Sequence, residues 1–243
     1  MHLLDIAKRV SRYALRQIEN RVPVRLRSLW RLQPIGRSFG LDRGWPIDRY
    51  YIDSFIARNS MDIRGRVLEA GGLTSYARRV GGKRVDQIDV LYPKEGFPDA
   101  TLVGDLMTGR GIPSDAFDCV LLTQVLQFIY DLPSAVAHVH RALKPGGVVL
   151  ATLPGISQVC GYDRQQWGEY WRFTDMSVLR LFSEAFGKEN VAVEAHGNVL
   201  VACAFLQGLA IQDLRREELE HEDANYQFAI SVRAVKQPTP VTE

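Results

Sequence analysis

Short apolar runs alternate with longer stretches of helical periodicity along the chain from residue 66 onward. This alternation is typical of repeated βαβ units, in which helices connect parallel strands. The runs at 118–122 and 148–151 are almost continuously apolar, as expected for strands that helices cover on both faces. The strands that the pattern predicts are 67–68, 87–90, 101–103, 117–122, 148–152, 191–195 and 228–234.

The segments between these runs complete the predicted architecture. Pro145-Gly146-Gly147 supplies a turn before the fifth strand, and helices are expected around 50–56, from 176 and over about 198–212. We therefore predict an α/β fold: a doubly wound, Rossmann-like sheet of seven mostly parallel strands with helices on both faces. Apolar positions near helical spacing in residues 3–18, with basic residues between them, predict an N-terminal helical extension.

Charge is distributed unevenly along an otherwise ordinary globular composition. The chain has 30 Lys and Arg against 28 Asp and Glu, but residues 1–31 hold eight basic and two acidic side chains. A basic amphipathic helix either packs on its own domain, which we favour, or makes a peripheral contact with an anionic membrane or a protein partner. The cluster lacks interleaved aromatic side chains that stack on bases, so no nucleic-acid partner is expected.

The cysteines indicate a reducing compartment. Cys119, Cys160 and Cys203 follow no paired metal or redox spacing, and their odd number argues against a disulfide framework, so no metal is expected. Charged residues from Asp5 onward interrupt any apolar signal core, and no apolar stretch is long enough to span a bilayer. We expect a cytoplasmic protein.

Acidic or glycine residues mark the ends of the first three predicted strands, where ligands bind in open α/β sheets. Glu69-Ala70-Gly71-Gly72 ends the first strand, the second strand ends at Asp89, and Gly104-Asp105-Leu106 follows the third. Asp89 lies twenty positions after Glu69, a spacing at which an acidic residue can accept the hydroxyl hydrogens of a ribose. For each acidic residue alone a cap or turn role is favoured, but together at the ends of three successive strands they favour a cofactor site. Residues 71–76 lack the Gly-x-Gly-x-x-Gly pattern of a nicotinamide dehydrogenase.

The ordered set resembles the class I S-adenosylmethionine-dependent methyltransferases, particularly the type 11 group, over roughly residues 63–153. Its most specific part is 117–128 followed by Leu143-Lys144-Pro145-Gly146-Gly147. The resemblance implies S-adenosyl-L-methionine as cofactor, with Glu69 and Gly71 near its methionine portion and Asp89 on its ribose. It implies a cofactor-binding set of Glu69, Gly71, Gly72, Asp89, Val90, Asp105, Leu106 and Gln124, in which Asp105 and Leu106 surround the adenine and Gln124 lies beside the methyl-donor end.

The chain departs from the family pattern at two places. The family's loop reads Glu-x-Gly-x-Gly-x-Gly, but Leu73 and Ser75 occupy the later two glycine positions, and Gln127 stands where many relatives have His. The alternative function is therefore a methyltransferase-like binding module without catalysis, docked through the basic N-terminal helix.

Segments 42–51 and 160–174 lie outside the core pattern and are rich in aromatic and charged residues. Their likeness to methyltransferases found with glycan-building enzymes implies a sugar, glycan or other small-molecule acceptor, methylated at oxygen. The predicted substrate-binding residues are Arg49, Tyr51, Tyr162, Trp167, Tyr170, Trp171 and Arg172. Trp167 and Trp171 fit a helix core equally well. The base is not assigned; Asp163 and Glu169 are the catalytic candidates, followed by His196, although a solvated or capping role is favoured for each.

These interpretations divide the chain into three parts. Residues 1–60 form an N-terminal helical extension and substrate-side cap, 61–236 form the class I methyltransferase domain, and 237–243 are a flexible tail.

Overall fold

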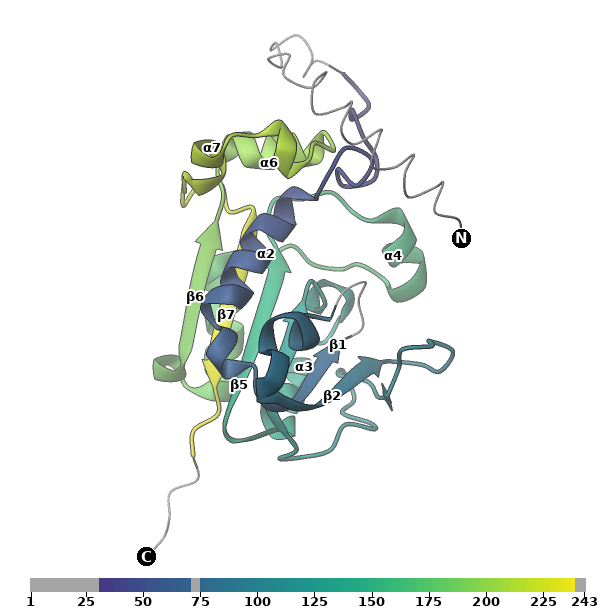
Figure 1. The fold of residues 1–243 in the computed structure, drawn as a ribbon, viewed down its shortest axis with the longest axis vertical. Helices are drawn as coiled ribbons and strands as arrows, with labels where there is room; N and C mark the ends of the chain where they lie inside the picture. The colour runs from purple at the N-terminus through teal and green to yellow at the C-terminus, as the bar shows by residue number, and fades with distance from the viewer. Residues whose placement is uncertain (1–30, 71–74, 239–243) are drawn as a thin grey trace, which may run out of the picture.

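The computed structural model describes residues 31–70 and 75–238 as a seven-stranded sheet with helices on both faces (Figure 1). The strands are β1 (Gly65–Ala70), β2 (Val85–Tyr92), β3 (Leu102–Val103), β4 (Phe117–Thr123), β5 (Leu143–Pro154), β6 (Val191–His196) and β7 (Ala229–Val235). The α-helices are α2 (Ile47–Arg58), α3 (Leu132–Ala142), α4 (Gly161–Trp167), α5 (Asp175–Phe186), α6 (Val199–Leu206) and α7 (Arg216–Glu220). Shorter helical turns are η2 (Ser60–Asp62), η3 (Ala77–Gly81), η4 (Gly82–Arg84), η5 (Leu126–Phe128), η6 (Lys188–Asn190) and η7 (Ile211–Asp213).

The strand order is β3-β2-β1-β4-β5-β7-β6, and all neighbouring pairs are parallel except the two that include β7. This order confirms the predicted doubly wound, mostly parallel sheet. The predicted helix over residues 3–18 lies outside the described residues, so the prediction of a membrane or protein contact there stays a prediction.

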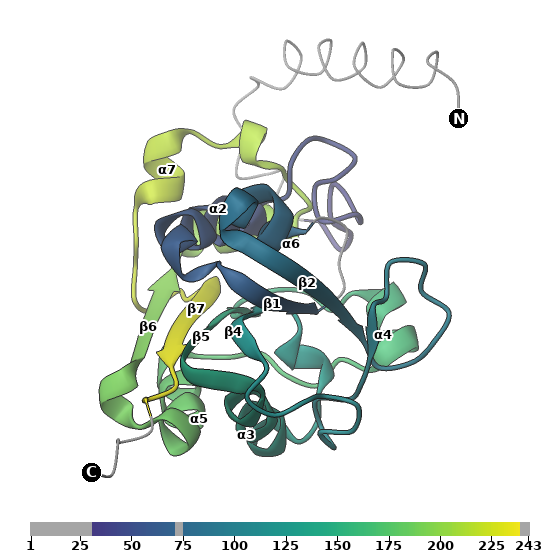
Figure 2. The same cartoon turned by 60° about the horizontal axis from the view of Figure 1, so that its bottom comes forward.

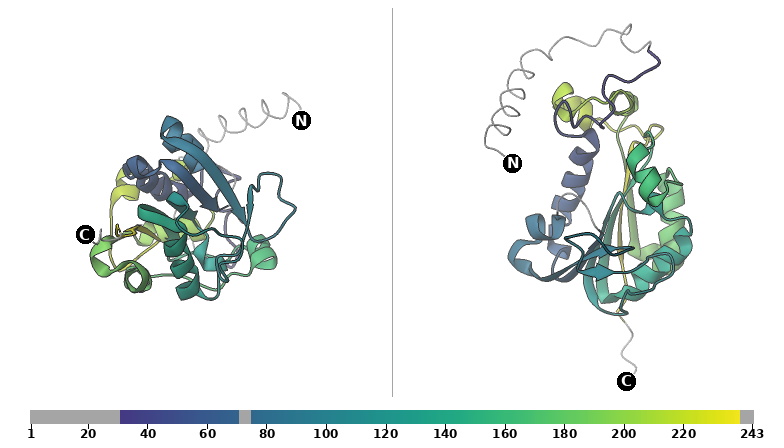
Figure 3. Two further views of the ribbon diagram at one scale, coloured as in Figure 1. Left: turned by 90° about the horizontal axis from the view of Figure 1, so that it is seen from below. Right: turned by 90° about the vertical axis from the view of Figure 1, so that its right-hand side faces the viewer.

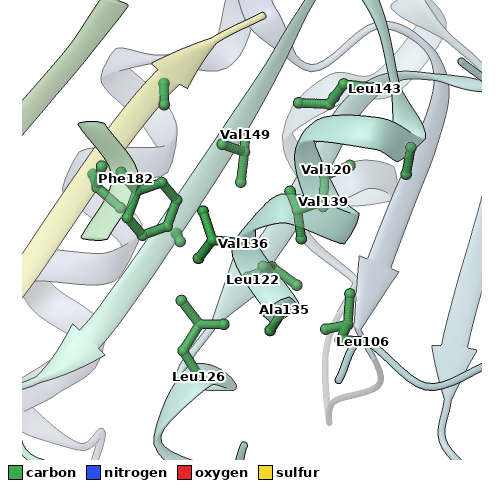
Figure 4. Close-up of a cluster of buried hydrophobic side chains, with 14 of the residues drawn as sticks. Leu106, Val120, Leu122, Leu126, Ala135, Val136, Val139, Leu143, Val149 and Phe182 are labelled. Atoms are coloured by element: carbon green, nitrogen blue, oxygen red, sulfur yellow. The ribbon is translucent and has the colours of Figure 1, made fainter. Parts of the chain in front are cut away.

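One face of the sheet packs against α3 and α5. Val136 and Val139 of α3 and Phe182 of α5 pack in one buried cluster with Val120 of β4 and Val149 of β5 (Figure 4). The apolar runs of β4 and β5 are buried because helices cover both sides, as their sequence indicates.

The opposite face packs against α2. Ile52, Phe55 and Ile56 of this helix are buried against a cluster that includes Val67 of β1 and Leu121 of β4. Figures 2 and 3 show α2 on one side of the sheet and the α3–α5 pair on the other. Because α2 is anchored along its length, its first turn is held at the end of the sheet where the parallel strands finish.

A third cluster joins α6 to the segment before α2 (residues 35–46). Pro46 forms a bridge with Ala210, and Arg43 forms an ion pair with Asp213 at 2.8 Å. Gly208 has a φ of 73°, a conformation that ends α6 at Leu206. The predicted helix over 198–212 is therefore wrong in extent, because a left-handed turn interrupts it.

The turn predicted before the fifth strand lies inside β5 instead. Leu143 already pairs with Phe117, the register shifts between Phe117 and Cys119, and Gly146 has a φ of 80°. The glycine therefore makes an irregularity within one long strand. Within residues 31–70 and 75–238, no helix is both long and apolar enough to cross a membrane, and no group of side chains has the composition of a metal site.

Candidate functional site

A cavity of about 1360 Å³ lies at the carboxyl ends of β1, β2, β4 and β5. The predicted site residues that line it are Glu69, Asp105, Leu106, Gln124, Arg49, Tyr162, Asp163, Trp167, Glu169 and Tyr170. The predicted residues that do not line it are Tyr51, Asp89, Val90, Trp171 and Arg172. Gly71 and Gly72 lie outside the described residues. The structure thus brings together residues from the two predicted groups, cofactor and acceptor, around one space.

Glu69 lies at the end of β1 and holds the start of the next described segment. Its carboxylate accepts a hydrogen bond from the Ser75 hydroxyl at 2.6 Å and another from the Tyr76 backbone N–H at 2.7 Å. Burial raises the pKa of Glu69, although both hydrogen bonds act in the opposite direction. Ser75 occupies the position of a glycine in the family's loop. Its hydroxyl therefore hydrogen-bonds and orients the Glu69 carboxylate.

The turn after β4 has a backbone conformation that is uncommon for its residue. Gln124 has a φ of 57°, which costs a residue with a Cβ about 1–2 kcal/mol. Two hydrogen bonds hold it there: its N–H donates to Thr152 O at 2.9 Å, and its carbonyl accepts from Gln127 Nε2 at 2.9 Å. A strained residue at a cavity wall is a common feature of functional sites.

The loop after β3 brings Asp105 and Leu106 to the cavity. The Asp105 carboxylate accepts hydrogen bonds from the Met107 N–H at 2.8 Å and the Thr108 hydroxyl at 2.9 Å, which makes it a turn residue as well as a lining residue. The carbonyl of Leu106 accepts a hydrogen bond from Nδ1 of His138, which lies on α3.

Asp89 lies inside β2 rather than at its end. The strand continues to Tyr92 because Leu91 pairs with both Ala70 and Leu102. The Asp89 carboxylate accepts from Arg66 Nε at 2.7 Å and from the Gln87 amide at 3.1 Å. Leu91 and Tyr92 line the cavity in place of Asp89 and Val90. The predicted end of this strand lies too early in the chain, and only a correct strand end would have predicted these two residues.

Aromatic contacts join the β2–β3 loop to α4 across the cavity. The Tyr92 ring stacks on Phe97 with centroids 4.1 Å apart, and Phe97 contacts the Trp167 ring at 5.5 Å. The ammonium of Lys94 lies 4.8 Å from the centroid of the same Trp167 ring. Figures 1 and 2 both show α4 beside the end of β2. We refer to these four side chains as the aromatic clasp.

Arg172 holds together residues 157–172, which we call the acceptor segment after the role predicted for residues 160–174. Its guanidinium donates to the carbonyls of Ser157 and Gln158 and, at 2.6 Å, to the Glu169 carboxylate. Glu169 also accepts from the Cys160 N–H at 2.8 Å. Both residues are therefore engaged in holding the loop. Trp171 lies after α4 and donates to the Ile129 carbonyl, so the alternative in which it shares a helix with Trp167 is wrong.

The start of α2 supplies a carboxylate that the sequence analysis missed. Asp48 lines the cavity, its side chain is 18% exposed, and its Oδ1 atom is buried without a hydrogen-bond partner. Burial raises the pKa of Asp48; the guanidinium of Arg49, with Nε 3.9 Å from Oδ2, lowers it. The sequence offered one indication of this role: Asp48 is next to Arg49, a predicted substrate-binding residue. Tyr51, one turn later, instead packs in the core and donates to the Leu219 carbonyl.

His196 is placed away from the cavity. Its ring nitrogens lie 2.9 Å from the Ser231 hydroxyl and 3.1 Å from Glu222, and its ring stacks on Tyr51. Ser231 is 2% exposed on β7, so this group of side chains joins the sheet to the segment before β7 and has no room for a substrate.

Comparison with known proteins gives a consistent result. Residues 66–151, from β1 through most of β5, match the family model described as a methyltransferase domain. A malonyl-(acyl-carrier protein) O-methyltransferase of Serratia marcescens is 29% identical over 119 residues, which are 45% of this chain and 44% of that protein. A probable S-adenosylmethionine-dependent methyltransferase of Mycolicibacterium smegmatis is 30% identical over 96 residues, 36% of this chain and 37% of that protein.

These curated matches span less than half of each relative. A likeness to the solved structure of the (4+2)-cyclase SpnF extends further, over 93% of this chain and 96% of that one, with a TM-score of 0.52 at 18% identity. The similarity to that structure shows the shared fold, and the match to the family model covers the strands from β1 to β5.

Proposed function

We propose that this chain is an S-adenosylmethionine-dependent methyltransferase of the class I fold. The observation that carries the proposal is the coincidence of two independent features. The cavity lies at the carboxyl ends of β1, β2, β4 and β5, and these strands fall in or beside the segment that matches a methyltransferase domain. Ligands of doubly wound sheets bind at this edge.

The residues at the β1–β3 side of the cavity fit the cofactor. Glu69 and Asp105 offer carboxylate oxygens to amino and hydroxyl groups, and Leu91 and Leu106 offer apolar surface to a flat base. Gln124, held in its left-handed turn, closes the end beside β4. When bound, the cofactor supplies a methyl group already activated on a sulfonium. The chain has to align an acceptor with it and exclude water.

The size of the cavity supports a second ligand beside the cofactor. Its volume of about 1360 Å³ is above the roughly 300–1,000 Å³ typical of a site for one drug-sized molecule. We propose that the second ligand is a hydroxylated ring acceptor, a sugar or glycan unit, methylated at oxygen. Trp45, Tyr162, Trp167 and Tyr170 line that half of the cavity and have the flat apolar faces on which such a ring stacks. The residues before 61 act as its cap.

Calorimetric titration with S-adenosylhomocysteine tests the proposal. We expect micromolar binding to the wild type and at least tenfold weaker binding to Met107→Trp, because Met107 is 41% exposed at the cavity wall and a larger ring there occupies cofactor space. Met61→Trp is the matched control, because Met61 is 70% exposed outside the cavity. No heat from the wild type would contradict the proposal and favour a binding module without catalysis.

A further inference from the structure

Few polar atoms inside a folded protein lack a hydrogen-bond partner, and each one requires an explanation. Among residues 31–70 and 75–238, three buried side-chain oxygens without a partner belong to residues that line the cavity: Asp48 Oδ1, Gln127 Oε1 and Gln158 Oε1. All three atoms accept hydrogen bonds and cannot donate them. A ligand that satisfies them must bring hydrogen-bond donors.

The orientation of Gln127 is fixed by its own neighbour. Its Nε2 donates to the carbonyl of Gln124, so the amide oxygen is the atom left without a partner. The residue is 5% exposed, and its backbone carbonyl accepts from the N–H of Tyr170 in the acceptor segment. The same side chain thus supports the turn at the methyl-donor end and presents an acceptor oxygen.

Six carboxylates of the described residues line the cavity: Asp48, Glu69, Asp99, Asp105, Asp163 and Glu169. Asp99 and Asp163 have no buried oxygen without a partner, so neither shares the feature that distinguishes Asp48. Glu69, Asp105 and Glu169 each accept two hydrogen bonds through their two oxygens. Asp48 retains an oxygen that accepts none. The charged groups that act on it are Arg49, which favours the ionised form, and Asp53, which disfavours it.

We infer that Asp48 is the general base of methyl transfer to a hydroxyl group, and that Gln127 accepts a hydrogen bond from a second hydroxyl of the same acceptor. The inference rests on the proposed function and goes beyond it by naming the residues that recognise the acceptor. The acceptor's O–H bond breaks and its proton goes to the Asp48 carboxylate. The acceptor oxygen forms a bond to the methyl carbon with a lone pair and displaces the sulfur, which keeps the electron pair of the broken C–S bond as a neutral thioether. A carboxylate whose pKa is raised by burial is better suited to this proton transfer than a solvated one.

The test measures transfer of labelled methyl groups from S-adenosylmethionine to a panel of methyl pyranosides of differing hydroxyl stereochemistry. We expect the wild type to methylate at least one of them. Asp48→Asn should lower kcat by about 100-fold or more with an unchanged affinity for S-adenosylhomocysteine, the range expected for loss of a general base. The wild-type kcat/KM should rise with pH through the titration of Asp48, and this rise should be absent from Asp48→Asn. Gln127→Met should raise the pyranoside KM about tenfold, the value of one hydrogen bond.

Asp86→Asn is the matched control, because Asp86 is an exposed carboxylate on β2 away from the cavity. Wild-type activity in Asp48→Asn, or the same pH profile in both, would overturn the assignment of Asp48. An unchanged KM in Gln127→Met would mean that Gln127 makes no hydrogen bond to the acceptor. Transfer to none of the pyranosides, with S-adenosylhomocysteine still bound, would overturn this inference alone. Absence of cofactor binding would overturn the proposed function as well.

Discussion

At the scale of single residues, the carboxylates around the cavity differ in whether their oxygens already accept hydrogen bonds from the protein. Glu69 anchors the segment after β1, and Glu169 anchors the acceptor loop through Arg172 and Cys160. Each has both oxygens engaged, so its removal should act first on structure. Asp48 has a buried oxygen without a hydrogen-bond partner, a cost that a donor group of a ligand would offset.

We expect Asp48→Asn to stabilise the protein at neutral and alkaline pH. Burial raises the pKa of Asp48 in the folded state, so between its unfolded and folded pKa values the folded chain binds more protons than the unfolded chain. The free energy of unfolding of the wild type therefore falls as the pH rises through the folded pKa. The Asn variant has no carboxylate to ionise and does not show this decrease. A gain of about 1 kcal/mol, the lower end of the cost of an unsatisfied buried group, corresponds to about 2–4 °C in Tm for a chain of this size.

Thermal unfolding followed across a pH series measures this effect. The difference in Tm between Asp48→Asn and the wild type should be present at about pH 8 and shrink toward about pH 3, where the carboxylate is mostly neutral in both states. Asp86→Asn should show no comparable difference. A variant less stable than the wild type at every pH would mean that Asp48 has a structural partner.

Asp89→Ala should affect stability more than cofactor affinity. The carboxylate is 9% exposed and holds Arg66 and Gln87 within the sheet, so its loss leaves a guanidinium without its partner. We expect a loss of about 1–3 kcal/mol in the free energy of unfolding, measured by urea denaturation. Titration with S-adenosylhomocysteine should give a dissociation constant within about threefold of the wild type, because Asp89 does not line the cavity. A threefold change corresponds to about 0.6 kcal/mol of binding free energy. A loss of binding without a loss of stability would support the ribose role that the sequence predicts.

At the scale of elements, the aromatic clasp connects two segments that are far apart in the sequence, the β2–β3 loop and α4. The β2–β3 loop contributes Lys94 and Phe97, and α4 contributes Trp167. The α4 helix has seven residues, none of them buried, so little else in the helix itself holds it against the sheet. A short helix of this kind depends on contacts made by its side chains.

Trp167→Ala should therefore release α4 without unfolding the domain. We expect backbone amides in 161–167 to exchange with solvent at least tenfold faster, while the Tm changes by less than about 4 °C, because the core clusters are untouched. Hydrogen exchange followed by mass spectrometry measures both segments of the clasp at once. Tyr226→Ala, at an exposed aromatic residue outside the cavity, is the control. Unchanged exchange in α4 would mean that the hydrogen bonds around Arg172 hold the helix instead.

For the molecule as a whole, a ligand that binds at the ends of several strands should stabilise the entire sheet. S-adenosylhomocysteine at one hundred times its dissociation constant should add about 2.7 kcal/mol to the free energy of unfolding. This corresponds to about 5–11 °C in Tm for a chain of this size, measured by differential scanning fluorimetry. Met107→Trp should lose most of this shift, and Met61→Trp should keep it.

Local sequence patterns were sufficient to specify the framework of the site. Strand positions, helices on both faces and the parallel core result from local periodicity, because burial on two faces leaves a continuous apolar run in β4 and β5. Glu69 and Asp105, which local patterns place next to strand ends, both line the cavity, as does Gln124, which only the family resemblance indicated. The order of strands then brings these positions to one edge, as in any doubly wound sheet.

Tertiary packing determines which of these side chains remain free. Asp89 is held by Arg66, Glu169 is held by the Cys160 N–H and by Arg172, and the short extent of α6 depends on a left-handed glycine. Asp48 precedes the whole sheet in the chain, and its place at the cavity comes from the packing of α2 on β1 and β4. Local sequence encodes backbone periodicity, whereas the partners of a polar side chain are chosen by neighbours that only the folded chain brings within hydrogen-bond distance.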